Sequence, residues 1–143
     1  MYSNYDSAPS IGSPKFLIIP VWFSDSSDYI SLSKKETVRN DIEKAYLGTT
    51  SETGWNSVHS FYYQESRNNL DIKGVVTDWY EINESISLYD TDSQTGQALT
   101  ATLAKKASTE YFNANPSTKT SFDYDHDGYL DGIILIYAGP NYS

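Results

Sequence analysis

The chain contains no cysteine, which excludes both disulfide bonds and thiolate metal sites. Basic residues are also scarce, since ten lysines and arginines are set against nineteen aspartates and glutamates, for a formal net charge of -9. Binding to a phosphate backbone depends on clustered cationic side chains. Nucleic acids and anionic lipid surfaces are therefore poor candidates as partners.

Long apolar segments are missing as well. The longest apolar run, FLIIPVWF, has eight residues, whereas a membrane-spanning helix needs about 20. We therefore predict no membrane insertion. No signal peptide is visible, and the polar, turn-rich start of the chain indicates that residues 1–14 are a linker or an end added for expression.

Catalytic motifs are equally hard to find. The only histidines are His59 and His126, and there is no H-E-x-x-H motif, although a catalytic zinc site needs three protein ligands and an open position. The sequence also contains neither a G-x-S-x-G elbow nor a glycine-rich phosphate loop. We predict no catalytic residue and no zinc ligand in this chain.

The remaining candidates for acid–base chemistry are weak. Two pairs of acidic residues, Asp78 with Glu81 and Asp90 with Asp92, could be interpreted as the catalytic carboxylate pair of a glycosidase. Exposed charges are the commoner origin of such pairs, and we expect both to lie on solvated faces. His59 falls on a predicted helix and is expected to be a surface or boundary residue.

Regular secondary structure is indicated along most of the chain by the spacing of apolar residues. The patterns predict a strand over 15–23, helices over 34–47 and 56–65, a bent strand or two short strands over 70–82, a helix over 97–114 and a strand over 132–139. Strands interleaved with helices predict an α/β fold, here with a mixed sheet of about four strands and three helices. Residues 83–95 are expected to form a loop.

Three positions make these predictions more specific. Ser33 and Glu36 fit a capping box at the start of the helix over 34–47. Pro20 cannot donate a hydrogen bond to a neighbouring strand, so the strand over 15–23 is expected at an edge or with a bulge at this residue. The strand over 132–139 is apolar without alternation, which predicts burial on both faces in the middle of the sheet.

An aspartate-rich loop precedes this last strand. The segment DYDHDGYLD has the D-x-D-x-D-G pattern of a calcium loop, in which alternate residues of a tight turn direct oxygens at the ion and glycine permits the bend. The predicted ligands are the side chains of Asp123, Asp125, Asp127 and Asp131 and the backbone carbonyl of Tyr129.

The calcium interpretation has one alternative, a solvated acidic turn that uses Asp and Gly for their backbone geometry. Four aspartates this close repel one another, and a bound ion would cancel the repulsion. Ile134 occupies the position where an EF-hand has its bidentate glutamate, and a strand follows instead of a helix, so we predict a structural ion without a switch. His126 alternates with the aspartates and is expected to point away from the ion.

Three segments together resemble a known family. KFLIIPVWFSD, SVHSFYYQESRNNLDIKGVVTDWYEI and FDYDHDGYLDGIILIYAG are similar to the amino-terminal half of the catalytic domain of immune inhibitor A-type zinc metallopeptidases. The resemblance covers about residues 15–139. The matching positions are Ser57, Val58, Phe61, Tyr62, Glu65, Ser66, Gly74, Trp79, Tyr80, the loop aspartates, Tyr137, Ala138 and Gly139.

The resemblance implies a fold and a function. Residues 15–143 would be the N-terminal part of a catalytic domain, a zincin-like and incomplete subdomain stabilised by structural calcium and inactive in isolation. Zinc would be bound only in the full-length parent, through an H-E-x-x-H helix that this chain lacks. The partners would be the remainder of the same domain and a polypeptide substrate, and the protein would be extracellular.

Two other functions remain open from the sequence. A non-catalytic calcium-dependent module could use some of the thirteen tyrosines and three tryptophans to bind carbohydrate or protein. However, Trp22, Trp79 and Tyr137 lie in predicted strands, where aromatic residues more often belong to the core. A peptidase relative that has lost its zinc helix and serves as a scaffold is the third possibility.

Overall fold

The computed structural model describes residues 12–49, 51, 57–90, 92–124, 126, 128 and 130–139, and every structural statement below concerns these residues. The strands are β1 (Lys15–Trp22), β2 (Lys73–Val76), β3 (Tyr80–Glu81) and β4 (Gly132–Tyr137). The α-helices are α1 (Lys35–Leu47), α3 (Val58–Glu65) and α4 (Gln94–Ala114), and short 3-10 helices occupy several of the connections.

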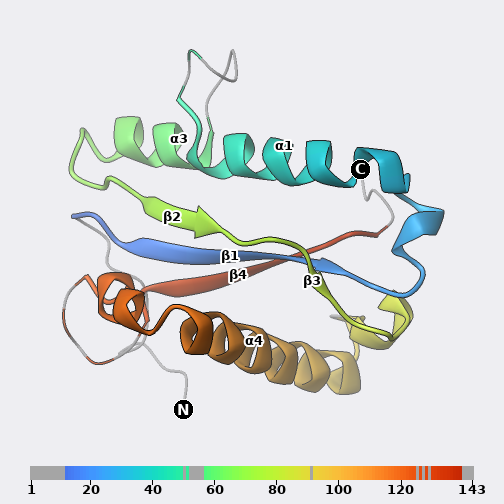
Figure 1. Cartoon of the computed structure of the whole chain (residues 1–143). Helices are drawn as coiled ribbons and strands as arrows, with labels where there is room; N and C mark the ends of the chain where they lie inside the picture. Colours follow the sequence, from blue (N-terminus) through green and yellow to red (C-terminus); the bar gives the residue numbers. More distant parts are fainter. Residues whose placement is uncertain are drawn as a thin grey trace.

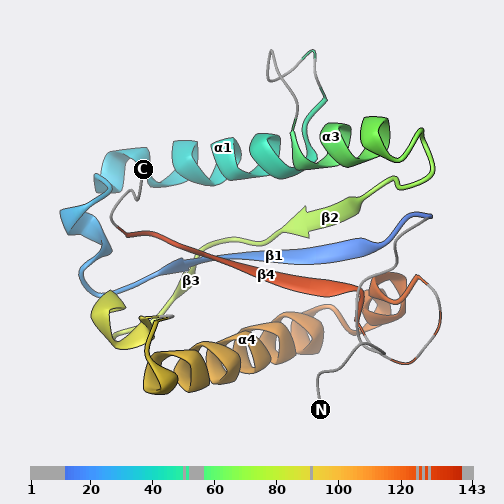
Figure 2. The same cartoon turned by 180° about the vertical axis from the view of Figure 1, so that it is seen from behind.

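The strands form one sheet between two helical layers. Helices α1 and α3 cover one face, and α4 covers the other (Figure 1; Figure 2 shows the same arrangement from behind). The α/β fold is therefore confirmed. The prediction of a mixed sheet is wrong for the described residues, because β1 pairs in parallel with each of β2, β3 and β4. The long helical connections account for this, since parallel strands need crossovers.

The sheet positions of the first and last strands differ from the prediction. β1 is central, with β2 and β3 along one edge and β4 along the other (Figure 1). β4 pairs only with β1 among the described strands, and its residues are half-buried. The apolar runs of the two strands resemble each other, so composition alone could not rank them.

Pro20 lies in this central strand without a bulge in its pairing with β4. Two carbonyls on either side of it, those of Ile18 and Trp22, accept hydrogen bonds from Thr77 and Ile82. By alternation along the strand, the nitrogen of Pro20 faces the same edge. It meets the gap between β2 and β3, where no ladder hydrogen bond is needed.

The predicted helices are present, with differences at their ends. α4 begins three residues earlier than predicted, at Gln94, and is capped by the hydroxyl of Ser93. The capping box predicted at Ser33 is absent, because Ser33 belongs to a 3-10 turn over Leu32–Lys34. A capping box does form at Ser57, whose hydroxyl accepts from the N–H of Ser60 at the start of α3.

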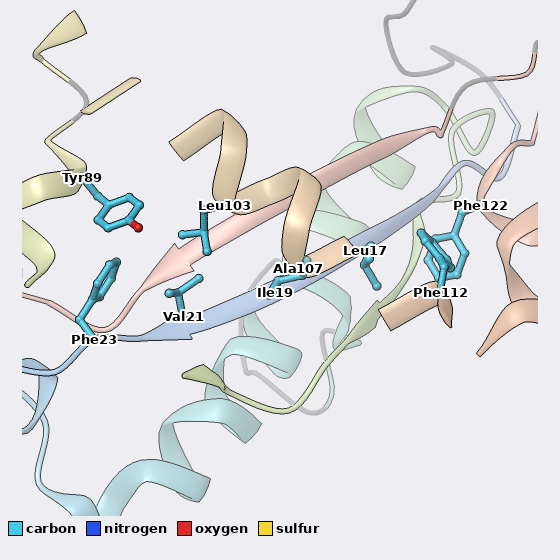
Figure 3. Close-up of a cluster of buried hydrophobic side chains, with 9 residues drawn as sticks. All are labelled: Leu17, Ile19, Val21, Phe23, Tyr89, Leu103, Ala107, Phe112 and Phe122. Atoms are coloured by element: carbon cyan, nitrogen blue, oxygen red, sulfur yellow. The ribbon is translucent and has the colours of Figure 1, made fainter. Parts of the chain in front are cut away.

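The main hydrophobic core lies between the sheet and α4 (Figure 3). The odd-numbered residues of β1 and Phe23 just after it point to this side, as expected for a strand with a two-residue period. The buried members of the core are Leu17, Ile19, Val21, Phe23, Tyr89, Leu103, Ala107, Phe112 and Phe122. The core thus joins β1 to the middle and the C-terminal end of α4 and to the segment before the aspartate loop.

Candidate functional site

The aspartate loop connects the 3-10 helix over Pro116–Phe122 to the start of β4. Its last aspartate, Asp131, is buried, with 4% of its surface exposed. The Oδ2 atom of Asp131 accepts a hydrogen bond from the backbone N–H of Lys15 at 2.8 Å. Both carboxylate oxygens lie within hydrogen-bonding distance of the N–H of Tyr124, at 3.0 and 3.1 Å. Asp131 therefore fastens both the loop and β4 to the first residue of β1.

The side chain of Lys15 strengthens the same junction. Its Nζ atom lies 4.6 Å from the centre of the Phe122 ring and donates to the hydroxyl of Ser121 at 3.3 Å. The N–H of Asp131 donates to the carbonyl of Phe122 at 2.7 Å, which brings the two ends of the loop together. The loop is closed at its base by protein groups.

The first aspartate closes the loop a second time. Asp123 accepts a hydrogen bond from the N–H of Gly128 through Oδ2, at 3.0 Å. Gly128 has a φ of +90°, a conformation that suits glycine, so the predicted sharp bend is present. His126 is exposed, and its φ of +57° lies in the left-handed region.

The structure describes only part of the predicted calcium ligand set. Asp123 and Asp131 are described, whereas Asp125, Asp127 and Tyr129 lie outside the described residues. Within the described part of the chain, no three His, Asp or Glu side chains converge as a metal-binding group. Carboxylate oxygens of the kind that Asp123 and Asp131 carry suit calcium, and an ionised carboxylate offers about four acceptor positions. The calcium site stays a prediction.

The other polar residues considered from the sequence have structural positions. His59 is half-buried, and its Nδ1 atom lies 2.8 Å from the carbonyl oxygen of Ile72, so it links α3 to the segment before β2. The side chain of Asp78 is fully exposed, and that of Glu81 is 68% exposed and pairs with Lys35. Asp90 and Asp92 are exposed as well, as expected for solvated charges.

Sequence reasoning missed a polar junction at the carboxyl ends of β1 and β4. Ser26 is completely buried, and its hydroxyl donates to the carbonyl of Ala138 at 2.6 Å while accepting from the N–H of Phe23 at 2.7 Å. Beside it, Asp25 accepts from the N–H of Ile86 and from the hydroxyl of Ser85. The hydrogen bond from Ile86 lowers the pKa of the Asp25 carboxyl, and that from Ser85 acts in the same direction. A serine in a polar SDSS stretch gives no signal of such burial.

Two tyrosines near α4 donate to glutamates. The hydroxyl of Tyr89 donates to Glu84 at 2.8 Å, and that of Tyr80 donates to Glu110. Burial, reinforced by the hydrogen bond to Glu84, raises the pKa of Tyr89 to about 12. Burial and the contact with Glu110 raise the pKa of Tyr80 to about 12 as well. Both phenols therefore stay neutral near neutral pH and act as donors.

The aromatic residues placed in strands by the sequence belong to the interior. Trp22 is buried and packs edge-on against Trp79, with 5.2 Å between the centres of the two rings. Tyr137 packs edge-on against Phe23, and its hydroxyl lies 2.8 Å from that of Thr100 on α4. These rings join elements to one another and form no exposed platform for a ligand.

Comparison with known families decides the classification. A model of the immune inhibitor A peptidase M6 catalytic domain matches residues 13–139. The chain belongs to this family. It is thus a metallopeptidase-related domain, of a family that implies zinc in the complete protein and a polypeptide substrate. No curated protein matches the chain. None of the described helices is both long and apolar enough to span a membrane.

Proposed function

We propose that the chain is the N-terminal part of the catalytic domain of a secreted zinc-dependent endopeptidase. The observation that carries this proposal is the family match, which runs through residues 13–139 and so includes every described strand and α-helix. Peptidases of this family are typically extracellular, which supports secretion. The partners are the remainder of the same domain and, in the complete protein, a polypeptide substrate.

The role of these residues is to form a scaffold. The sequence has two histidines and no H-E-x-x-H motif, so the zinc ligands are expected in the remainder of the domain. When bound there, zinc supplies a water activated for attack on a peptide carbonyl. Residues 15–143 contribute the parallel sheet and the helices against which that part of the domain packs, and they are inactive in isolation.

The experiment compares the isolated chain with the complete catalytic domain. Both are purified, their zinc content is measured, and cleavage of a fluorescently labelled unfolded polypeptide is followed. We expect one zinc and cleavage for the complete domain, loss of cleavage with 1,10-phenanthroline and recovery on adding zinc. A zinc-loaded complete domain that cleaves no polypeptide would contradict the proposal, and so would equal cleavage by the isolated chain.

We also propose that a structural calcium ion occupies the aspartate loop. Support comes from the D-x-D-x-D-G spacing and from the bend at Gly128, which has the backbone conformation such a loop requires. The contacts of Asp131 with Lys15 and Tyr124 hold the loop against β1, so an ion bound here would stabilise the junction of β1 with β4.

Thermal unfolding with excess EDTA and with about 1–5 mM Ca²⁺ tests this site. At a hundredfold excess over Kd, an ion that binds only the folded state adds about 2.7 kcal/mol to the free energy of unfolding. Asp125→Ala should abolish the calcium-dependent rise in Tm, whereas Asp41→Ala, which removes an exposed charge from α1, should keep it. Equal Tm values with EDTA and calcium would reduce the loop to a plain acidic turn.

A further inference from the structure

Gly12 attaches the chain just before β1 to the segment that precedes β2. Its N–H donates to the carbonyl of Asn69, and its carbonyl accepts from the N–H of Asp71, both at 2.7 Å. These two hydrogen bonds form a parallel bridge between Gly12 and Leu70, separate from the ladder of β1 with β2, which begins at Lys15. The backbone is therefore docked at Gly12 before it enters the sheet.

The ring of Tyr124, from the aspartate loop, covers this docked residue. Gly12 has a φ of +89°, and a Cβ added there would overlap the ring of Tyr124. Glycine adopts this backbone conformation readily and has no Cβ to meet the ring. The docked backbone and the loop are thus in direct contact through Gly12 and Tyr124.

One carboxylate holds both sides of this contact. Asp131 accepts hydrogen bonds from the N–H of Tyr124 and from the N–H of Lys15, at the start of β1. A shift of this carboxylate would move both the residue whose ring covers Gly12 and the strand into which Gly12 leads. Asp131 is also a predicted calcium ligand, since its oxygens are of the kind that calcium prefers. Calcium binding and the docking of Gly12 therefore depend on the same side chain.

The bridge at Gly12 lies where a structure opens most easily. Asn69 is exposed and Asp71 is half-buried, and the side chain of Tyr124 is about half-exposed. Backbone hydrogen bonds at such peripheral positions break in local fluctuations, without unfolding of the core. The docking of Gly12 is therefore an equilibrium that the position of the Tyr124 ring can shift.

We propose that calcium binding at the aspartate loop is coupled, through Asp131 and Tyr124, to the docking of Gly12 beside Leu70. This inference rests on the calcium site proposed above and gives that ion a second effect. Calcium holds the backbone before β1 against the domain, and removal of calcium releases it. Because such coupling is reciprocal, a change that undocks Gly12 weakens calcium binding by the same factor.

Residue-resolved amide hydrogen exchange measures the coupling directly. The chain is compared in excess EDTA and in about 5 mM Ca²⁺. We expect the amides of Gly12 and Asp71 to exchange about 10-fold more slowly with calcium, a typical size for coupling between two sites. The amide of Ile82 is the control, because it donates to the carbonyl of Trp22 at the other end of β1 and should change little.

A double-mutant cycle isolates the contact between the ring and the glycine. The calcium Kd is measured by calorimetry for the wild type, Gly12→Ala, Tyr124→Ala and the double variant. Gly12→Ala places a Cβ against the ring and should weaken calcium binding about 10-fold. In the Tyr124→Ala background the same change strains the backbone equally but meets no ring, so its effect should fall below about twofold. Tyr124→Phe keeps the ring and should bind calcium as the wild type does.

Several results would overturn the proposal. Calcium could bind without slowing exchange at Gly12 and Asp71, or it could slow Ile82 equally, which would mean that it stabilises the chain as a whole. Gly12→Ala could have the same effect with and without the ring. If the wild type bound no calcium, the calcium site and this coupling would both be refuted. None of these readouts involves cleavage of a polypeptide, so each of these failures would leave the proposed peptidase function standing.

Discussion

The two faces of the sheet are held by different kinds of contact. On one face, α4 contributes buried residues along its length and packs against the core of Figure 3. On the other face, α1 and α3 contribute no fully buried residue, and an apolar groove of about 300 Å³ lies between these helices and the sheet. A groove of about 1110 Å³ also lies on the α4 side, where Ala101 and Ala104 face Ile133 and Leu135 of β4, so the two layers differ in the residues that they bury and not in the presence of a groove. The α4 layer is thus attached through buried side chains to a greater extent than the α1/α3 layer.

Polar contacts attach α1 to the sheet on the α1/α3 face. The guanidinium of Arg39 donates to the carbonyls of Val76 and Thr77, where β2 ends. The Nζ atom of Lys35 lies 4.5 Å from the centre of the Trp22 ring, and the backbone carbonyl of Lys35 accepts from the indole N–H of Trp79. Contacts of this kind fix orientation but contribute less than burial of apolar surface. The comparison indicates that most of the stability of this chain comes from the α4 face.

The largest expected effect comes from a matched pair of substitutions in β1. Ile18 and Ile19 are each 1% exposed and point to opposite faces. Ile19→Ala should lower the free energy of unfolding by about 4 kcal/mol, and Ile18→Ala by about 2 kcal/mol. The groove beside Ile18 already deprives it of some contacts, so less is lost there. Urea unfolding measures both values, and equal losses would remove the difference between the faces.

The next effect concerns the junction of the aspartate loop with β1. Asp131→Ala leaves the backbone N–H groups of Lys15 and Tyr124 without their carboxylate acceptor. The free energy of unfolding should fall by about 2–3 kcal/mol, because hydrogen bonds to a buried carboxylate are stronger than those between neutral groups. Unfolding is measured in EDTA, so that calcium does not contribute. A loss below about 0.5 kcal/mol, as for an ordinary surface substitution, would show that this junction contributes little.

A smaller effect is expected from Arg39→Lys on the α1/α3 face. Lysine keeps the positive charge but has no planar group that can donate to two carbonyls at once. The free energy of unfolding should therefore fall by about 1 kcal/mol. Arg67→Lys is the control, because Arg67 is exposed in the turn after α3. Urea unfolding of both variants gives the comparison, and equal effects would mean that the contacts of Arg39 with β2 add nothing measurable.

The mildest effect is a loss of stability at alkaline pH. Tyr89 has a pKa raised from 10.0 to about 12, so the folded state holds its proton more tightly than the unfolded state does. The resulting stability is complete below about pH 10 and is lost as the pH rises from about 10 to 12. Tyr89→Phe should reduce this alkaline slope in urea midpoints measured between pH 8 and 11. An unchanged slope would assign it to other groups, Tyr80 included.

Local patterns in the sequence were sufficient for the elements but insufficient for their order in the sheet. The strands around Ile18 and Ile134 were found because both are short apolar runs. Which of them is central depends on pairing between distant segments. Pro20 suggested an edge or a bulge because the sequence does not show that the two short strands over 70–82 both pair with β1 and leave a gap opposite this residue. Ser33 and Ser57 show the same limit, since both precede helices and the 3-10 turn before α1 decides against Ser33.

At the aspartate loop, the spacing of the aspartates is enough to predict a candidate calcium site, because calcium coordination favours oxygen-bearing residues at every second position. The bend at Gly128 was anticipated in this way. The hydrogen bonds of Asp131 to Lys15 and Tyr124 were not, because they join positions far apart in the chain or depend on how the loop closes. Residues whose role arises from tertiary contact, such as Ser26, carry no local signal.

Native-state amide hydrogen exchange of the isolated chain tests the difference between the two faces most directly. Exchange is followed under increasing urea, so that partial opening is separated from global unfolding. We predict that the amides of α1 and α3 exchange through an opening of lower free energy, while those of β1 and α4 exchange only when the whole chain unfolds. A single opening free energy shared by all three helices would contradict the account.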